Sequence, residues 1–260
     1  MRSFHKPELA SHRRWLGQQG DERLRRWESL LAVDEEAAIV EAGTQHFLGS
    51  LVDRMEPAED LAQGGPDFRC FRAGHRFYVE CTCIRESVVT DKTGLTPWPP
   101  EDAQVYGHLT QQVLNECKNK AKQCSGLDGP CLLAIGTLHC QAGDLCWDKV
   151  SVEDILTGSP CITRHIDTRT GASIGDTYES TDLADAAFCR KSNNPDCSLE
   201  LARKSISGLL LFGFGSSPPI VIGVLHPNPV RPFDRSLLPG VEFCALEGGY
   251  DKGKLSVCWV

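Results

Sequence analysis

The 260-residue chain lacks the long hydrophobic runs that proteins use to cross a membrane. No apolar stretch approaches the roughly 18 residues of a transmembrane helix, and the first residues, MRSFHKPELASHRRW, contain no hydrophobic signal core. We therefore expect a cytoplasmic protein without a membrane partner. Apolar residues make up 41% and charged residues 24% of the chain, a composition that suits one sizeable core with additions.

Several catalytic and metal-binding patterns are missing as well. The segment GFGSS lacks both the G-x-S-x-G of a nucleophile elbow and the Gly-Lys-Ser/Thr of a phosphate-binding loop. The thirteen cysteines are odd in number, and only Cys81 and Cys83 form a close pair, which is too closely spaced for a zinc ribbon. We expect reduced, at least partly buried cysteines, and no ordered nucleophile and base support a thiol hydrolase.

The net charge of -8 argues against a surface that binds nucleic acid without specificity, although it permits a local cationic groove. Residues 1–33 carry seven Lys or Arg against four acidic residues, a pattern typical of solvated helix faces. Their apolar spacing predicts one or two helices with a break near residues 17–20. Asp34 then predicts the start of a helix over residues 35–55. On it Glu41 borders the apolar stripe, where it either reaches solvent or joins a functional site.

A β-hairpin is predicted by PDFRCFRAGHRFYVECTCI, residues 66–84. In its second strand, Phe77, Val79 and Cys81 alternate with Tyr78, Glu80 and Thr82. Because successive strand side chains point to opposite faces, the side chains of Glu80 and Thr82 share one face.

The length of the turn decides where Asp67 lies. A two-residue loop of Ala73 and Gly74 places Asp67 opposite Glu80, and a loop of Gly74 and His75 places it opposite Thr82. An odd-length loop turns Asp67 away. Directly opposed side chains approach to about 5 Å, so two carboxylates there repel each other unless a cation lies between them. Such oxygen ligands suit Mg²⁺ or Mn²⁺.

A helix predicted over residues 105–125 carries one lysine on its apolar side. On a helical wheel centred on Val113, Lys120 falls inside the apolar arc with Gln123 beside it, whereas Lys118 and Lys122 fall on the outer face. A lysine facing a core needs an anion. Lys120 therefore either extends from the edge of the stripe to solvent or meets the paired carboxylates.

These residues carry a resemblance to a known group of enzymes. Pro66-Asp67 followed by Glu80-Cys81-Thr82 resembles the PD-(D/E)xK nuclease superfamily, with Thr in place of the usual Lys. Further motifs resemble a bacterial branch of that superfamily, and together they cover about residues 34–245: FYVECT, KAKQ at 120–123 with GLDGP, SVEDILTG, and HPNP followed by LLPGVEF.

The resemblance implies an α/β fold with a restriction-endonuclease-like αβββαβ core, in which helices flank a mixed sheet. We expect a helical extension at residues 1–33 and a nuclease-like domain at 34–260, with extra C-terminal strands at 207–214 and 220–225. We expect residues 141–205 to form an irregular insertion whose one short helix begins at Ser151 and stops at Gly158. The proline-rich segment 86–102 is expected to be a loop, in which Trp98 either anchors the loop or stacks on a base.

The resemblance also implies a metal-dependent nuclease acting on DNA, or secondarily on RNA. The implied metal ligands are Asp67, Glu80 and the backbone carbonyl of Cys81, with Mg²⁺ or Mn²⁺ as the cofactor. The role of the missing strand lysine would move to Lys120. The full catalytic set implied is Asp67, Glu80, Lys120 and Gln123, with Glu41 and Thr82 as further candidates.

A different class of function stays open. With Thr82 in the lysine position, the chain could be a catalytically inactive nuclease-fold module that binds nucleic acid or a protein partner. Whether Lys120 reaches the pair of Asp67 and Glu80 separates the two interpretations.

Overall fold

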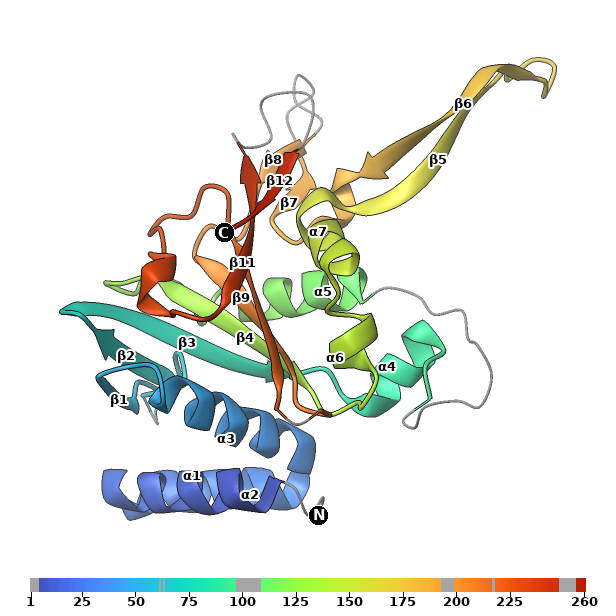
Figure 1. The fold of residues 1–260 in the computed structure, drawn as a ribbon. Coiled ribbons are helices and arrows are strands. Elements are labelled where there is room, and N and C mark those ends of the chain that lie inside the picture. The colour runs from blue at the N-terminus through green and yellow to red at the C-terminus, as the bar shows by residue number, and fades with distance from the viewer. Residues whose placement is uncertain are drawn as a thin grey trace.

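A large mixed sheet runs through the computed structural model, with helices on both of its faces (Figure 1). The structure describes residues 5–60, 62, 64–96, 109–192, 199–216, 218–247 and 256–260. Within them, the sheet has the strand order β1-β2-β3-β4-β9-β10-β11-β12. The expected α/β class with helices flanking a mixed sheet is confirmed.

The helices have the following bounds: α1 Lys6–Gln19, α2 Asp21–Val33, α3 Glu35–Gly49, α4 Glu86–Thr93, α5 Thr110–Lys120, α6 Ala142–Leu145 and α7 Lys149–Thr157. The strands of the large sheet are β1 Arg54–Pro57, β2 Phe68–Arg72, β3 His75–Cys83, β4 Cys131–Thr137, β9 Gly208–Gly213, β10 Ile220–Leu225, β11 Glu242–Glu247 and β12 Ser256–Trp259. Two separate hairpins are formed by β5 Ser159–Ile166 with β6 Ser173–Asp182 and by β7 Cys189–Lys191 with β8 Leu199–Leu201.

The N-terminal segment forms two helices, α1 and α2, which separate at Gly20, where φ is +120°. Figure 1 shows α3 lying between this pair and the sheet. Leu9, Leu16 and Trp27 belong to the same apolar core as α3 and the strands above it. Helices α1 and α2 are thus an extension in sequence but share a core with α3 and the sheet.

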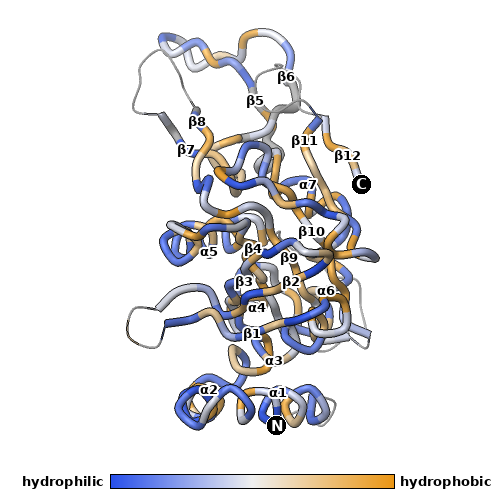
Figure 2. Tube along the Cα trace, turned by 90° about the vertical axis from the view of Figure 1, so that its left-hand side faces the viewer, coloured by the Kyte–Doolittle hydropathy of each residue, from blue (hydrophilic) through white to orange (hydrophobic). Residues whose placement is uncertain are grey.

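Helix α3 is buried on more than one side. The Asp34 side chain accepts a hydrogen bond from the backbone N–H of Ala37, as expected of an N-cap. Ala38, Ile39 and Ala42 are buried although they lie outside the apolar stripe that helical spacing predicts, because α1 and α2 cover the side of α3 that faces away from the sheet. Figure 2 shows apolar residues concentrated in the central strands and hydrophilic residues on the outer sides of α1 and α2.

Of the turn lengths that the sequence left open, the β2–β3 hairpin has the two-residue loop of Ala73 and Gly74. Arg72 pairs with His75, so Ala73 and Gly74 form the turn. Both have positive φ, +49° and +77°, as a type I′ turn requires. Phe68 pairs with Val79, and the position before Phe68, Asp67, therefore falls opposite Glu80 and not opposite Thr82.

The central strand β4 lies parallel to both β3 and β9 and is buried along its whole length. Gly136 lets α3 approach it, because a Cβ there would lie 2.6 Å from Cγ1 of Val40. This close packing sets the distance between α3 and the sheet, and therefore the distance between Glu41 and the edge of β3.

Several sequence-based boundaries were wrong. Helix α3 ends at Gly49, not at residue 55, because Arg54–Pro57 pairs with β2 as strand β1. Residues 86–93 form helix α4 where a loop was predicted, and Trp98 lies outside the described residues. Helix α7 starts before Ser151, since Asp148 accepts the N–H groups of Val150 and Ser151. Gly158, with φ of +83°, ends it as predicted.

The segment 141–205 is far more regular than predicted. It contains α6, α7 and the hairpins β5–β6 and β7–β8, and Figure 1 shows β5 and β6 as a ribbon projecting from the body. Ile162, Ile166 and Ile174 of this ribbon are exposed. An alternating pattern signals a strand only when one face is buried, and the side chains of β5 and β6 that the structure describes, at 162, 164–166, 173–177 and 181, are all exposed.

The cysteines agree with the prediction of free thiols. The eleven whose side chains are described carry no disulfide, and all are buried or half-buried. Across the described part of the chain, none of the helices combines the length and the apolar character needed to cross a bilayer.

Candidate active site

The candidate site lies where β3 extends past the end of β2. On one side β3 pairs with β2 only as far as Val79, while on the other it pairs with β4 through to Cys83. Asp67 Oδ2 accepts the N–H of Cys81 at 2.7 Å. The Asp67 carboxylate thus accepts the hydrogen bond that a backbone carbonyl of a neighbouring strand would otherwise accept.

The carbonyl of Cys81 faces the same edge as Asp67. The N–H and C=O of one strand residue point to the same side of the strand. Tyr78 and Ile84 direct their N–H groups toward β4, so the intervening odd-numbered residue Cys81 directs both backbone groups away from β4. The three predicted oxygen donors, Asp67, Glu80 and the Cys81 carbonyl, therefore come from adjoining positions of one hairpin.

Lys120 reaches this edge from α5. Its Nζ donates a hydrogen bond to Oε1 of Glu80 at 2.7 Å. The Glu80 side chain is 2% exposed and that of Lys120 25%, whereas Lys118 and Lys122 are exposed on the outer face. Lys120 therefore meets the carboxylate of Glu80 and does not simply extend from the edge of the apolar stripe to solvent.

The site holds more negative charge than Lys120 offsets. Burial, together with the charges of Glu80 and Glu41, raises the pKa of Asp67 well above its usual value, despite the hydrogen bond from Cys81. Burial also raises the pKa of Glu80, and Lys120 counteracts this only in part. Burial opposes the charge on Lys120, but the contact with Glu80 outweighs it and the pKa of Lys120 is raised.

Glu41 is held by the N-terminal helix. Its Oε1 lies 3.3 Å from Nε2 of the fully buried His12, while Nδ1 of His12 lies 3.4 Å from Oε1 of Gln45. The Glu41 side chain is 19% exposed and lines the same cavity as Asp67 and Glu80. Together with Glu59, these three side chains form what we call the acidic cluster. Of its two predicted environments, Glu41 has the one inside the site.

Thr82 and Gln123 line the same cavity as Asp67 and Glu80. The Thr82 hydroxyl donates a hydrogen bond to Glu116 Oε2 at 2.8 Å. Thr82 thus fixes a residue of α5, and the position that carries a lysine in the resembled superfamily supplies no charge here.

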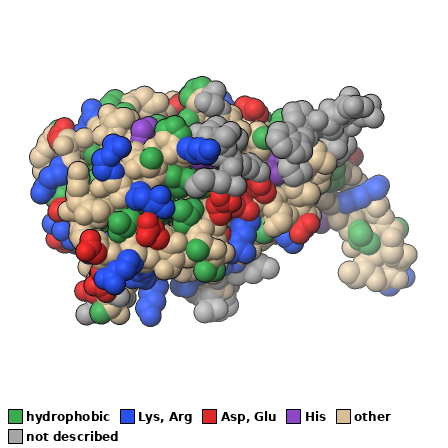
Figure 3. Space-filling model, turned by 90° about the horizontal axis from the view of Figure 1, so that it is seen from below, with side chains coloured by type: hydrophobic (Ala, Val, Ile, Leu, Met, Phe, Trp, Pro, Cys, Tyr) green, Lys and Arg blue, Asp and Glu red, His purple; other side chains and the backbone are tan. Residues whose placement is uncertain are grey.

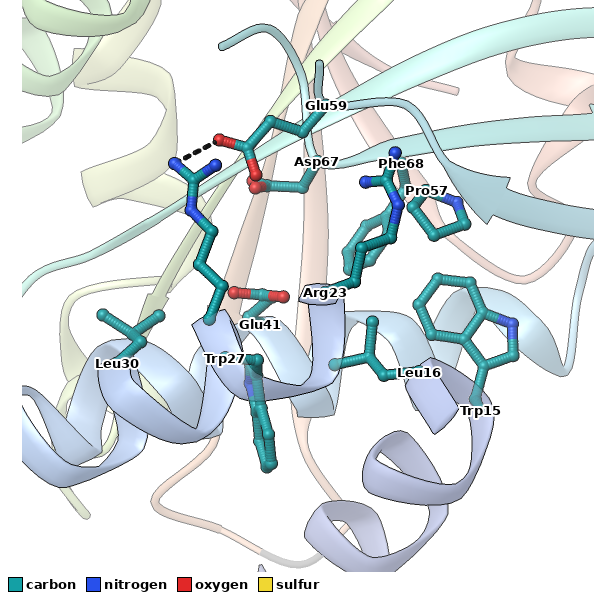
Figure 4. A pocket seen from close by; sticks show the side chains of 11 residues that line it. Trp15, Leu16, Arg23, Trp27, Leu30, Glu41, Pro57, Glu59, Asp67 and Phe68 are labelled. Atoms are coloured by element: carbon teal, nitrogen blue, oxygen red, sulfur yellow. Dashed lines mark ion pairs between the residues drawn. The ribbon is translucent and has the colours of Figure 1, made fainter. Parts of the chain in front are cut away.

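Glu59 and Glu116 belong to the site but were not predicted. In Figure 4 the carboxylates of Glu59 and Asp67 point toward each other with Glu41 below them, and Arg26 forms an ion pair with Glu59 at 2.8 Å. Burial raises the pKa of Glu59, and Arg26 opposes this. Glu116 precedes Lys120 by one helical turn, so the helical wheel could have placed the two side chains on the same face of the helix. Glu59 follows strand β1, which the sequence did not reveal.

Two adjoining cavities surround the cluster. The larger, about 470 Å³, extends along β3 and α5 past Glu80 and Lys120. The smaller, about 230 Å³, lies between the α1–α2 pair and the start of β2. Leu30, Glu41, Glu59 and Asp67 line both, so the acidic cluster forms their common wall.

The donor set suits a divalent cation bound by few protein ligands. Over the described ranges, no three Asp, Glu, His or Cys side chains converge into a ready metal cluster. Mg²⁺, however, commonly uses only one or two carboxylates and keeps several waters. Oε2 of Glu80 is buried without a hydrogen-bond partner among the described residues. A cation there would satisfy this oxygen and offset the repulsion that raises the pKa of Asp67.

Comparison of the chain with models of protein families, with curated proteins and with solved structures gave no match.

We predict that Asp67→Asn stabilises the fold at neutral pH by about 0.5–2 kcal/mol, as relief of conflicts at functional sites commonly does. The pKa of Asp67 is raised on folding, so the wild type loses stability as pH rises from the unfolded-state pKa through the folded-state pKa, and the Asn variant lacks this contribution. The difference should shrink toward about pH 4, near the unfolded pKa. Urea unfolding across this pH range measures it.

The matched control is Asp91→Asn on the exposed side of α4. An Asp67→Asn gain that does not change with pH, or one that Asp91→Asn reproduces, would contradict the electrostatic description of the site.

Proposed function

We propose that the protein is a metal-dependent phosphodiesterase that cleaves nucleic acid, with DNA as the first expected substrate and RNA as the second. The observation that carries the proposal is the contact of Lys120 with Glu80 beside Asp67. It brings two acids and a lysine together from sequence-distant elements at an open strand edge. The order α3, β1, β2, β3, α5, β4, in which the additional helix α4 lies between β3 and α5, supports the resemblance to the αβββαβ core.

Asp67, Glu80 and the Cys81 carbonyl would hold Mg²⁺ or Mn²⁺. When bound, such an ion would polarise a phosphate oxygen and lower the pKa of a coordinated water. The requirement for a cation follows from the charges on the chain itself, because Glu41, Glu59, Asp67 and Glu80 would otherwise repel a phosphate.

Lys120 supplies the positive charge that Thr82 lacks. Its ammonium has three donors, so while one contacts Glu80 the others remain to orient a water or to bind a phosphate oxygen that gains charge. The ion pair holds this ammonium at the strand edge, which reduces the reorganisation needed during the reaction. Thr82 acts indirectly, through its hydrogen bond to Glu116 on the same helix.

We predict that the wild type cleaves single-stranded or duplex DNA when Mg²⁺ or Mn²⁺ is present, and that Asp67→Ala lowers the rate by at least about 100-fold, as loss of a group acting on transition-state charge does. Gel analysis of end-labelled DNA, with a chelator as the metal-free reaction, measures both. Metal-independent cleavage, or an active Asp67→Ala variant, would refute the proposal. A folded protein that binds but never cuts would instead favour the catalytically inactive binding module.

A second prediction concerns the lysines of α5. Lys120→Ala should lower turnover by about 100-fold or more, because it removes the cation beside Glu80, while Lys118→Ala and Lys122→Ala change it little. Single-turnover rates at saturating DNA measure the chemical step. Equal losses in all three variants would point to general attraction of the phosphate backbone, which fades steeply with salt.

A further inference from the structure

The smaller cavity opens directly beside the acidic cluster. Figure 4 shows it between the α1–α2 pair and the start of β2, with Glu41, Glu59 and Asp67 on the side of the candidate active site. Its volume of about 230 Å³ lies below the roughly 300–1,000 Å³ of drug-sized ligand pockets. A ligand here would be one flat ring or a short piece of chain.

One wall of this cavity is aromatic and apolar. Trp15, Leu16, Pro57 and Phe68 line it (Figure 4). The ring of Trp15 packs edge-on against Phe68, with 5.9 Å between centroids, and its centroid lies 5.5 Å from that of the buried His12 ring, with 30° between the ring planes. Trp15 is nonetheless only half-buried. An indole that neighbouring rings hold in place while part of it stays accessible is suited to stacking with a ligand ring.

The same cavity contains two arginines of α2. Arg26 is engaged with Glu59 at 2.8 Å. Arg23 also lines the cavity, and within the described residues its guanidinium forms no ion pair. Figure 4 shows the Arg23 side chain beside Pro57 and Phe68, at the aromatic side of the cavity. A free guanidinium next to an accessible indole matches an anion attached to a flat ring, which is the chemistry of a nucleotide.

We infer that this cavity binds one unpaired nucleotide of a single-stranded nucleic acid, with the base against Trp15 and a phosphate at Arg23. The inference rests on the proposed function and specifies its substrate class. Stacking on aromatic side chains beside a cationic group is how proteins bind single strands without reading sequence. A duplex could enter only by unstacking and unpairing a base, at a cost of a few kcal/mol.

The charge on the surrounding surface favours this local mode of binding. Figure 3, viewed from the side of α1 and α2, shows Lys and Arg interspersed with Asp and Glu, not gathered in one basic patch. Because the net charge is -8, long-range attraction cannot account for tight binding here. Affinity would have to come from specific contacts such as those at Trp15 and Arg23.

Binding tests the inference independently of cleavage. We would measure fluorescence anisotropy of labelled single-stranded DNA, single-stranded RNA and duplex DNA with the Asp67→Asn protein in the presence of a chelator, so that bound DNA is not consumed and all variants share one metal-free background. Adding Trp15→Leu or Arg23→Ala should weaken single-strand binding about tenfold each, in line with the worth of one stacked base. Duplex binding should be weaker and little affected by either change. Arg25→Ala is the matched control, because Arg25 is exposed on the same helix and lines neither cavity.

The outcomes separate this inference from the proposed function. If the wild type cleaves DNA but neither Trp15→Leu nor Arg23→Ala alters single-strand affinity, the subsite is wrong and the nuclease proposal stands. If binding depends on both residues while the wild type never cleaves, the subsite stands and the nuclease proposal fails. Equal weakening by Arg23→Ala and Arg25→Ala would overturn the inference in favour of general electrostatic attraction. Thermal melts of Trp15→Leu exclude misfolding, and Arg23→Ala, which removes no core side chain, provides a second test.

Discussion

The structure around β3 depends on the need to offset acidic side chains gathered at an open strand edge. Glu80 is matched by Lys120 from α5 and Glu59 by Arg26 from α2, while the buried imidazole of His12 from α1 lies 3.3 Å from Glu41. Asp67 has instead a backbone N–H of β3. Each acid is thus tied to a different element. Placing partly buried charges together is unfavourable unless such partners exist.

This arrangement explains why the N-terminal helices are part of the site. In sequence they look like a solvated extension, and their charges look like a surface pattern. In the fold, α1 and α2 cover α3, share its apolar core and bring His12 and Arg26 to the acids. Their outer position relative to α3 also creates the smaller cavity. One helical pair therefore serves stability, charge balance and, in our proposal, contact with the substrate.

The hairpin and the lysine could be predicted because they depend on local periodicity. Strict alternation restricted Asp67 to a position opposite Glu80 or Thr82 for a two-residue turn, and the pairing of Arg72 with His75 in the structure decides for Glu80. The helical wheel separated Lys120 from Lys118 and Lys122, and the structure decides that Lys120 contacts a carboxylate. The missing elements depend on long-range pairing. Strand β1 is four residues long and exists through its ladder with β2, so Glu59 could not be placed. His12 reaches Glu41 only because α1 packs on α3, which no spacing within either helix encodes.

In the function that we propose, Asp67 and Glu80 share one divalent cation. Isothermal titration of the wild type, Asp67→Asn and Glu80→Gln with Mn²⁺, in two buffers of different ionisation enthalpy, tests it directly. We expect the wild type to bind Mn²⁺ with a net release of protons that grows as the pH is lowered, because the metal competes with protons for a carboxyl whose pKa is raised in the free protein. Both variants should lose most of the affinity. Absence of Mn²⁺ binding by the wild type, or equal binding by all three proteins, would contradict the claim.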